Sequence, residues 1–452
     1  MEAIKKFFPQ FIQKTTLIHP LQDHNYDIET HSSNNDTMEI TVYHLARAHV
    51  NALAERQPEL GINSSDKLCV CIAALLHDLG HGPLSHTFEI FMKQANPEAR
   101  WKHEECSTKI FRYMLAHNQE LKNILNKYLN EIDYVFIAEM INPPKEFIIN
   151  GEWQLQGRDK NKSFLYDIVS NKHDCIDVDK FDYLMRDSKS TKINIPFCKT
   201  ALARIQIYME ARDFDFGYSR IVYGRKIRDN INGVMFSRED LHTKLYQHKT
   251  VVACETMIVD AWLKATPYFK VLTEQGEYDL VHAIENIEAF LQLNDLLLEQ
   301  ILQSKDPYLK ESQAILQKVE NRHTLRLIGQ TFLFSNCKKT TTEIKNEILK
   351  LDNTIHPNSV IVVIREIHRG KSIEDDPITE VRIFNEANPT DNETNQLSYY
   401  WKETNIASKT GKRNVYVYVP YETSLIEKEK IFVAFEKLCR KINCCELPVK
   451  VC

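Results

Sequence analysis

The feature that most constrains this chain is the segment AALLHDLGHGPLSH, Ala73–His86. Ten consecutive residues of this segment contain four potential ligands of a metal or phosphate: His77, Asp78, His81 and His86. An apolar run precedes them and glycines bend the backbone between them, which predicts a buried helix that ends in a ligand-bearing turn. Adjacent imidazole and carboxylate form a mixed N/O donor set that suits Fe, Mn or Zn. In the alternative, the histidines only cap the helix end and bond their own loop.

The composition is that of an ordinary globular protein. Hydrophobic residues make up 43% and charged residues 26% of 452 residues, with a net charge of −5. This length predicts more than one packed unit. No apolar run reaches the roughly 18 residues of a membrane span, and the N-terminus lacks the features of a signal peptide. The 11 cysteines form no CxxC pair, which favours a reducing compartment, the nucleus or the cytoplasm.

The organisation predicted along the chain is mainly α, with a helical body followed by a smaller α+β lobe. Residues 1–37 are irregular, residues 38–330 carry helical patterns, and residues 331–452 form the α+β lobe. Long helical patterns cover Ile110–Leu129, Leu241–Ala265 and Ala283–Leu302, interrupted by a short hairpin at Arg220–Lys226. In the lobe, strands are predicted at Ser359–Ile367, Glu380–Phe384 and Asn414–Val419. A polar loop is predicted at Asn385–Arg413, between the last two strands, and a final helix at Leu425–Arg440.

A second informative cluster is IDVDKFDYLMRD, Ile176–Asp187. Asp179 lies about 100 residues after His77, so that a separate helix could supply a third, carboxylate ligand to the metal. Lys180 suits a phosphate oxygen, and the Tyr183 hydroxyl could hydrogen-bond one. A surface helix with alternating charges is the simpler interpretation of this segment alone, but its pairing with the first cluster favours a site.

In these motifs the chain resembles the HD-domain phosphohydrolases, and among them the SAM- and HD-domain-containing deoxynucleoside triphosphate (dNTP) triphosphohydrolases of animals. The SAM domain of the long members is not found. The matching motifs occur in order within residues 40–330: QPEL (Gln57–Leu60), HDLGHGPLSH (His77–His86), WKHEECS (Trp101–Ser107), NKSFLYDIVSNK (Asn161–Lys172), IDVDKFDYLMRD (Ile176–Asp187) and LYQHK (Leu245–Lys249).

The resemblance implies hydrolysis of a dNTP to deoxynucleoside and tripolyphosphate, which lowers dNTP pools. Such chemistry needs a metal, cations that absorb triphosphate charge, and an acid for the leaving 5′-oxygen. A divalent metal (Fe, Zn or Mn) would occupy the HD site, and Mg would accompany the triphosphate. The implied metal ligands are His77, Asp78 and Asp179. The implied catalytic residues are His86, His103, Glu104 and Glu89, the last standing where the family usually has Asp.

The resemblance also implies substrate contacts. The triphosphate would be contacted by His81, Lys180, Tyr183 and Arg238. Asp187 would bind the sugar 3′-hydroxyl, and the Tyr246 ring would pack where a 2′-hydroxyl would clash. Gln247 falls near the sugar, and His242 lies one turn before Tyr246 and could face the same pocket.

Assembly is a further implication of the resemblance. Family members form tetramers when GTP and dNTP effectors bind between subunits, and Lys249 matches one effector contact. A homo-oligomer, from dimer to tetramer, is therefore expected. The basic effector residues near the C-terminus are not recognisable. The corresponding stretch contains Lys409, Lys412 and Arg413, and a solvated loop is the favoured interpretation of it.

The chain departs from the family at the first histidine ligand. Counting back without gaps from QPEL places that position at Met38, a soft ligand that suits a phosphohydrolase metal poorly. His31, His44 and His49 are the nearby histidines. Either the N-terminal segment diverges on an active scaffold, or the chain is a weakened, metal-poor homologue. The alternative function is accordingly a non-catalytic protein that binds nucleotides or single-stranded nucleic acid, and a third is a phosphohydrolase of other nucleotides or of nucleic acid ends.

Overall fold

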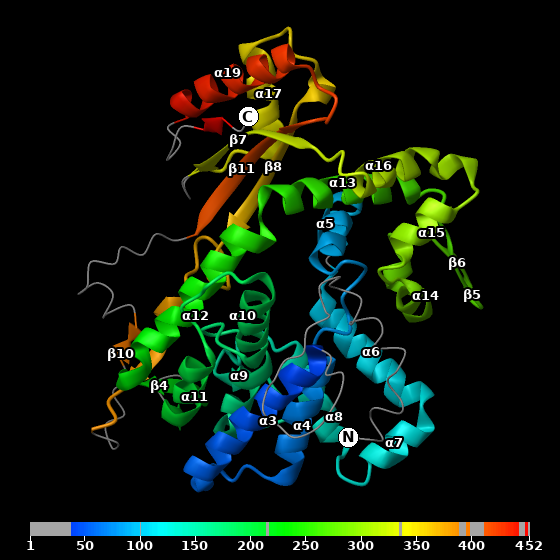
Figure 1. Ribbon diagram of the computed structural model, residues 1–452. Helices are drawn as coiled ribbons and strands as arrows, with labels where there is room; N and C mark the ends of the chain where they lie inside the picture. Colours follow the sequence, from blue (N-terminus) through cyan, green and yellow to red (C-terminus); the bar gives the residue numbers. More distant parts are fainter. Residues whose placement is uncertain are drawn as a thin grey trace. The chain divides into compact units, whose positions relative to one another are not determined.

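The computed structural model describes residues 38–99, 101–213, 217–333, 337–387, 395–397, 411–442 and 448–450. Most of these residues are helical, with smaller sheets among them (Figure 1). The prediction of a mainly helical fold with a smaller α+β region is thereby confirmed. The predicted irregular segment 1–37, including His31, lies outside the described residues, as does Lys409. None of the described helices combines the length and apolar character needed to cross a bilayer.

Contacts divide the chain into two interleaved compact units. The first contains residues 1–237, 271–297 and 377–406, and the second contains residues 238–270, 298–376 and 407–452. The chain thus leaves the first unit and re-enters it twice.

The first unit is built largely from helices. They are α3 (Met38–Arg56), α4 (Ser64–Leu76), α5 (His86–Ala95), α6 (His103–His117), α7 (Gln119–Leu125), α8 (Glu131–Ile141), α9 (Tyr166–Val169), α10 (Val178–Thr191), α11 (Lys199–Tyr208), α14 (Ile287–Gln292) and the start of α12 (Arg228–Leu241). Its main sheet has the order β10–β9–β4–β3, formed by β3 (Met209–Asp213), β4 (Ser219–Gly224), β9 (Arg382–Phe384) and β10 (Asn395–Gln396). Two hairpins complete it, β1 (Ile148–Ile149) with β2 (Glu152–Trp153) and β5 (Val271–Thr273) with β6 (Gly276–Tyr278).

A buried ion network ties the starts of two of these helices together. Asp66 closes the capping box of α4 and Asp133 closes that of α8. The Arg158 guanidinium binds both carboxylates, at 2.7 Å from Asp66 Oδ1 and 2.6 Å from Asp133 Oδ1. Arg158 also lies 4.3 Å from the ring centroid of Phe136, and Lys162 binds the other oxygen of Asp66. Helix α4 ends directly before the turn that contains His77 and Asp78, which we call the HD turn. The network therefore fixes the helix that positions these two predicted metal ligands.

The predicted hairpin at Arg220–Lys226 is wrong in its extent. The observed hairpin pairs β3 with β4, from Met209 opposite Tyr223 to Asp213 opposite Ser219. Arg225–Ile227 forms a 3-10 turn instead of a second strand. The first strand, MEARD, consists mostly of good helix formers, and pairing with β4 overrides that local preference.

The predicted long helices are shorter than expected, mainly because asparagines cap new ones. Asn118 ends α6 and its side chain accepts the Leu121 amide of α7. Asn286 starts α14 in the same way. The stretch predicted over Leu241–Ala265 is likewise divided into the end of α12, a π-helical turn at His242–Tyr246, and α13 (Lys249–Ala265).

The second unit is centred on a sheet with the order β12–β7–β11–β8. Its strands are β7 (Arg326–Leu333), β8 (Ile361–Ile367), β11 (Lys412–Val419) and β12 (Val449–Lys450), and its helices are α13, α15 (Leu297–Gln303), α16 (Lys310–Glu320), α17 (Thr341–Leu351) and α19 (Leu425–Lys441). The predicted strand at Ser359–Ile367 and final helix at Leu425–Arg440 correspond closely to β8 and α19. The predicted strand at Glu380–Phe384 is β9, which pairs with β4 in the first unit.

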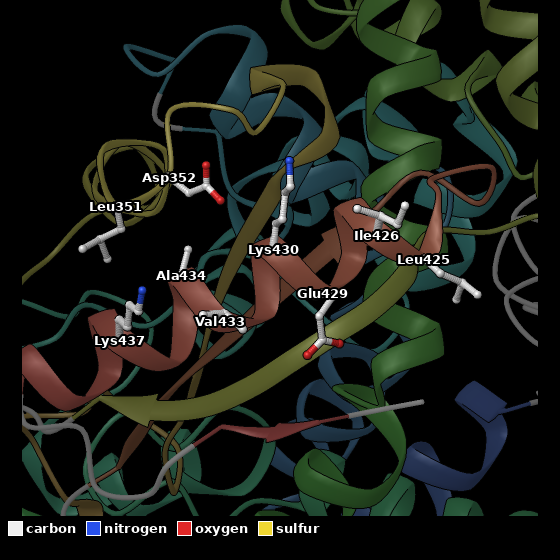
Figure 2. Close-up of a pocket in the computed structure, with 9 residues that line it drawn as sticks. All are labelled: Leu351, Asp352, Leu425, Ile426, Glu429, Lys430, Val433, Ala434 and Lys437. Carbon is white, nitrogen blue, oxygen red and sulfur yellow. The ribbon is translucent and has the colours of Figure 1, made fainter.

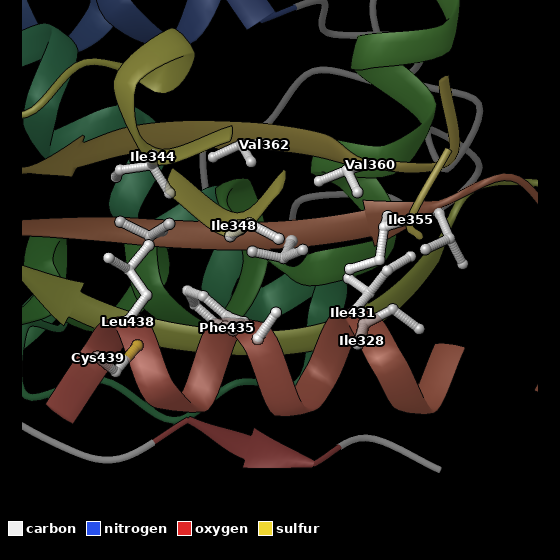
Figure 3. Packing of buried hydrophobic residues seen from close by; sticks show 14 of the residues in the cluster. Ile328, Ile344, Ile348, Ile355, Val360, Val362, Ile431, Phe435, Leu438 and Cys439 are labelled. Atoms are coloured by element: carbon white, nitrogen blue, oxygen red, sulfur yellow. The ribbon is translucent and has the colours of Figure 1, made fainter. Parts of the chain in front are cut away.

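Strand β11 alternates in a way that gives each face of this sheet its own core. Val415, Val417 and Val419 join the cluster shared with α17 and α19. Figure 3 shows other members of this cluster, among them Ile344 and Ile431. Tyr416 and Tyr418 point to the other cluster, which includes residues of α13. The strand begins at Lys412, so the predicted loop at Asn385–Arg413 is too long at its end and contains β10 within it.

We expect Arg158→Met to lower the free energy of unfolding by about 3–5 kcal/mol, because it leaves two buried carboxylates without their shared cation. Urea denaturation followed by circular dichroism measures this. The matched control, Arg112→Met, replaces an exposed arginine of α6 and should change stability by less than about 0.5 kcal/mol. Equal losses in both variants would show that the network is not special.

Candidate active site

The HD turn is held against the first turns of α6 by a glycine and a serine. Ser107 Oγ donates to the His77 carbonyl at 2.6 Å and accepts the Gly80 amide at 2.8 Å. A Cβ on Gly80 would lie 2.0 Å from the His103 carbonyl oxygen. Only glycine therefore allows the turn to approach α6 this closely. The contact brings His77 and Asp78 of the turn near His103 of α6.

His77, Asp78 and Asp179 form the first candidate metal group, with ligand atoms within 4.8 Å of one another. His77 Nδ1 donates to the Ala74 carbonyl at 2.9 Å, so that Nε2 faces the two carboxylates, each at 3.4 Å. This Nε2 is buried and makes no hydrogen bond to any residue that the structure describes. Burial opposes protonation of His77, yet Asp78 and Asp179 outweigh it and raise its pKa to about 10. Such an anionic set with an orphaned nitrogen fits a divalent cation.

Asp78, His81 and His103 form a second candidate group that shares Asp78 with the first. Asp78 Oδ1 lies 3.6 Å from His81 Nε2, and the His81 and His103 rings stack at 4.0 Å between centroids. Burial lowers the pKa of His81 to about 4, whereas Glu89, Asp78 and Glu104 overcome burial and raise that of His103. Two stacked cations would repel each other, so a single proton on this pair is favoured on His103 over His81.

Glu89 joins the two predicted catalytic histidines. Its Oε1 lies 2.6 Å from His103 Nδ1 and its Oε2 lies 3.3 Å from His86 Nδ1. These histidines hold the pKa of Glu89 below its usual range in spite of burial. His86 follows two residues with positive φ, Leu84 at 54° and Ser85 at 49°, a costly conformation that is typical of functional sites. The Glu89 carboxylate thus contacts both rings, one through each of its oxygens.

Helix α10 carries the remaining predicted residues of the first unit. Its N-cap is Asp177, whose Oδ1 accepts the Lys180 amide at 3.0 Å and lies 3.6 Å from Lys180 Nζ. Lys180 and Asp187 are buried, and Asp187 accepts from Arg186 at 2.9 Å. Tyr183 is half-buried on the same helix. The cap therefore orients the first turn of α10, which carries Asp179 and Lys180.

The other predicted contacts lie in the second unit. The Arg238 guanidinium donates to the His368 carbonyl, and the His242 and Tyr246 rings lie 5.0 Å apart within the π-helical turn. Gln247 Nε2 donates to the Glu366 carbonyl at 2.7 Å, so this amide is bound to β8.

Two buried tyrosines anchor the backbone of the following residues. Tyr416 donates to the Gln247 carbonyl at 2.8 Å, and Tyr418 donates to the Lys249 carbonyl at 2.7 Å. The segment that joins the π-helical turn to α13 is thus attached to β11 through its main chain.

Neither described histidine near Met38 joins a candidate metal group. The side chain of Met38 itself lies outside the described residues. His44 is exposed. His49 is buried at 5.4 Å from the Phe181 ring and 3.2 Å from Gln206 Nε2, and burial lowers its pKa to about 4. Among the described residues, His77 is the one imidazole of the first group.

Three positioning residues were not predicted from the sequence: Ser107, Asp177 and Lys172. Lys172 Nζ lies 3.3 Å from Glu104 Oε1, and Glu104 Oε2 lies 3.7 Å from His103 Nδ1. Each lies inside one of the motifs quoted above. Their place within a motif was the available signal, but their roles depend on contacts between distant segments.

Comparison with known proteins assigns the class. Residues 39–184, which span α3 to α10 and contain both candidate metal groups, match the family model of the HD domain. This part of the chain belongs to the HD-domain family.

Within that family it is similar to deoxynucleoside triphosphate triphosphohydrolase SAMHD1. It is 38% identical to the Mus musculus protein over 336 residues, 72% of this chain and 51% of the relative. It is 34% identical to the Homo sapiens protein over 418 residues, which are 86% of this chain and 64% of the relative. A SAMHD1 homolog of Dictyostelium discoideum is 29% identical over 348 residues, 76% of this chain and 60% of the relative. The chain thus spans about half to two thirds of these relatives.

We expect His77→Ala to reduce bound metal at least about tenfold, because even changes outside the ligand shell cost about 10–100-fold in metal affinity. Elemental analysis after dialysis against Mn²⁺, Fe²⁺ or Zn²⁺ measures the content. His117→Ala, which removes an exposed histidine of α6, should retain the wild-type amount. Metal retained by the folded His77 variant would contradict the assignment.

Proposed function

We propose that this protein is a metal-dependent hydrolase of deoxynucleoside triphosphates that releases deoxynucleoside and tripolyphosphate. The observation that carries the proposal is the junction at Asp78, where an anionic group suited to a cation meets a histidine pair suited to move a proton. The names of the SAMHD1 relatives point to the same substrate class.

His77, Asp78 and Asp179 would hold the metal, which supplies Lewis acidity toward a phosphate oxygen and a more acidic water. The imidazole is oriented for this task by its Nδ1 bond to Ala74, and Asp179 by the capped first turn of α10. Buried Lys180 supplies positive charge beside these carboxylates, as a triphosphate requires.

His103 is the residue best suited to protonate the leaving 5′-oxygen. Its Nδ1 is bonded to Glu89, and this carboxylate, together with Asp78 and Glu104, raises the pKa of His103 and so favours its protonated form. General acids act best when they hold their proton at the working pH. His81, neutral because of burial, would contact a phosphate oxygen, and Glu89 would keep His86 and His103 oriented together.

The other proposed roles follow the family. Tyr183, Arg238 and His81 would contact the triphosphate, Asp187 the 3′-hydroxyl, and Tyr246, His242 and Gln247 the sugar side. Lys249 would contact a GTP or dNTP effector in a homo-oligomer, and Mg would enter with the triphosphate. Gln247 would have to leave the Glu366 carbonyl before its amide could contact a sugar.

A non-catalytic protein that binds nucleotides or single-stranded nucleic acid is the second candidate. It is favoured by one observation, the single imidazole of the first metal group among the described residues. Binding of dGTP without product, in protein that contains little metal, would support this candidate.

The test is tripolyphosphate release from dGTP and from a dNTP mixture, with Mn²⁺ or Mg²⁺ and with or without GTP. We expect His103→Ala to lower the rate by about 100-fold to 10,000-fold, the usual contribution of a positioned acid or base. His117→Ala, on the same helix, should match the wild-type rate.

Two results would decide against the proposal. Folded, metal-loaded protein that releases no tripolyphosphate from any dNTP would contradict triphosphohydrolase activity. A rate that is unchanged in His103→Ala would contradict the role of the histidine pair.

A further inference from the structure

The outer face of α19 exposes apolar side chains that are normally buried. Leu425 is 82% exposed, Ile426 74% and Val433 37%, and Leu351 at the end of α17 is 39% exposed. Figure 2 shows these residues along α19 and beside it, where they line an open groove. The inner face of the same helix is buried, because Ile431, Phe435 and neighbouring residues belong to the hydrophobic cluster between α19 and the sheet (Figure 3). A contiguous exposed apolar surface of this kind marks an interaction site.

The charges on this face follow a symmetrical order around Val433. The exposed residues Ile426, Glu429, Val433, Lys437 and Arg440 recur at intervals of three or four, so they form one stripe. Glu429 lies four residues before Val433 and Lys437 lies four residues after it. Ile426 lies seven residues before Val433 and Arg440 lies seven residues after it.

This order is complementary to itself in only one direction. If two copies of α19 meet antiparallel with Val433 on the two-fold axis, each Glu429 faces a Lys437 and each Ile426 faces an Arg440. Parallel helices would instead place Glu429 against Glu429 and Lys437 against Lys437. The Arg440 guanidinium is 2.8 Å from Glu436 of its own helix. In the antiparallel contact, the aliphatic part of the Arg440 side chain would therefore cover Ile426 of the second copy.

We propose that the outer face of α19 binds the same face of a second copy of this chain in an antiparallel, two-fold symmetric contact. Such a contact is isologous, and the stripe supplies both halves of each charge pair. Leu351 and Leu425 widen the apolar part of the surface. A 17-residue helix is only about 25 Å long, so the contact is small and the dimer depends on protein concentration. This proposal does not depend on the hydrolase activity.

The experiment is sedimentation velocity on the full chain over a concentration series, without nucleotides. Wild type is expected to pass from monomer to dimer. Glu429→Lys and Lys437→Glu should each raise the dimer dissociation constant at least about tenfold, because like charges then face each other twice. The double variant, Glu429→Lys with Lys437→Glu, restores both pairs and should return to within about threefold of wild type.

A second variant tests the axis itself. Val433→Asp places two carboxylates on the two-fold axis and should abolish the dimer, whereas Ile132→Asp, at an exposed isoleucine of α8 that is 59% exposed, should not. The proposal is overturned if wild type remains monomeric throughout the series. It is also overturned if the double variant is no better than the single ones, which would point to another occupant of the groove, such as a different protein or an anionic surface.

Discussion

The candidate site depends on the Arg158 guanidinium and the two carboxylates that it joins. Asp66 and Asp133 begin helices α4 and α8, and each is already committed to a capping box. One cation between them fixes the separation of the two helix starts, and with it the direction in which α4 delivers His77. Buried ion pairs are not in themselves strongly stabilising, but they specify one arrangement over others when their partners are rigid. Here the partners are helix ends, so the geometry extends to the site.

Two energetically unfavourable features occur in the site that follows α4. Leu84 and Ser85 adopt positive φ, and several charged or titratable groups lie buried within hydrogen-bond reach of one another. The surrounding contacts hold these features in place: Ser107 bonds the turn on both sides, and Asp295 Oδ1 accepts the Leu84 amide at 2.8 Å. Strain that is enforced from several directions is characteristic of sites that must present side chains to a ligand.

Local signals predicted the helical class, two strands of the second unit's sheet, and the residues of the first candidate metal group. Strand β7 of that sheet was not predicted, and the strand predicted at Glu380–Phe384 pairs with β4 in the first unit. The turn after α4 and the first turn of α10 each contain their ligands within a few residues. The failures are also physical. MEARD was predicted as part of the helical body because its residues favour helix, and its pairing with β4 is a distant contact. Asn118 divides a continuous apolar pattern by its cap. Arg158 lies 92 and 25 positions from its partners, so no local pattern shows its role.

The tyrosine anchors of β11 have a consequence for how this chain can vary. Tyr416 and Tyr418 donate to carbonyl oxygens at 247 and 249, and carbonyls are present whatever the side chain. The anchors therefore tolerate many replacements in the π-helical turn and its exit. They do not tolerate a change in its length, because one inserted or deleted residue would move the carbonyls past the hydroxyls. Variation in this segment should consequently be restricted to exchange of residues, with a constant number of them between α12 and α13.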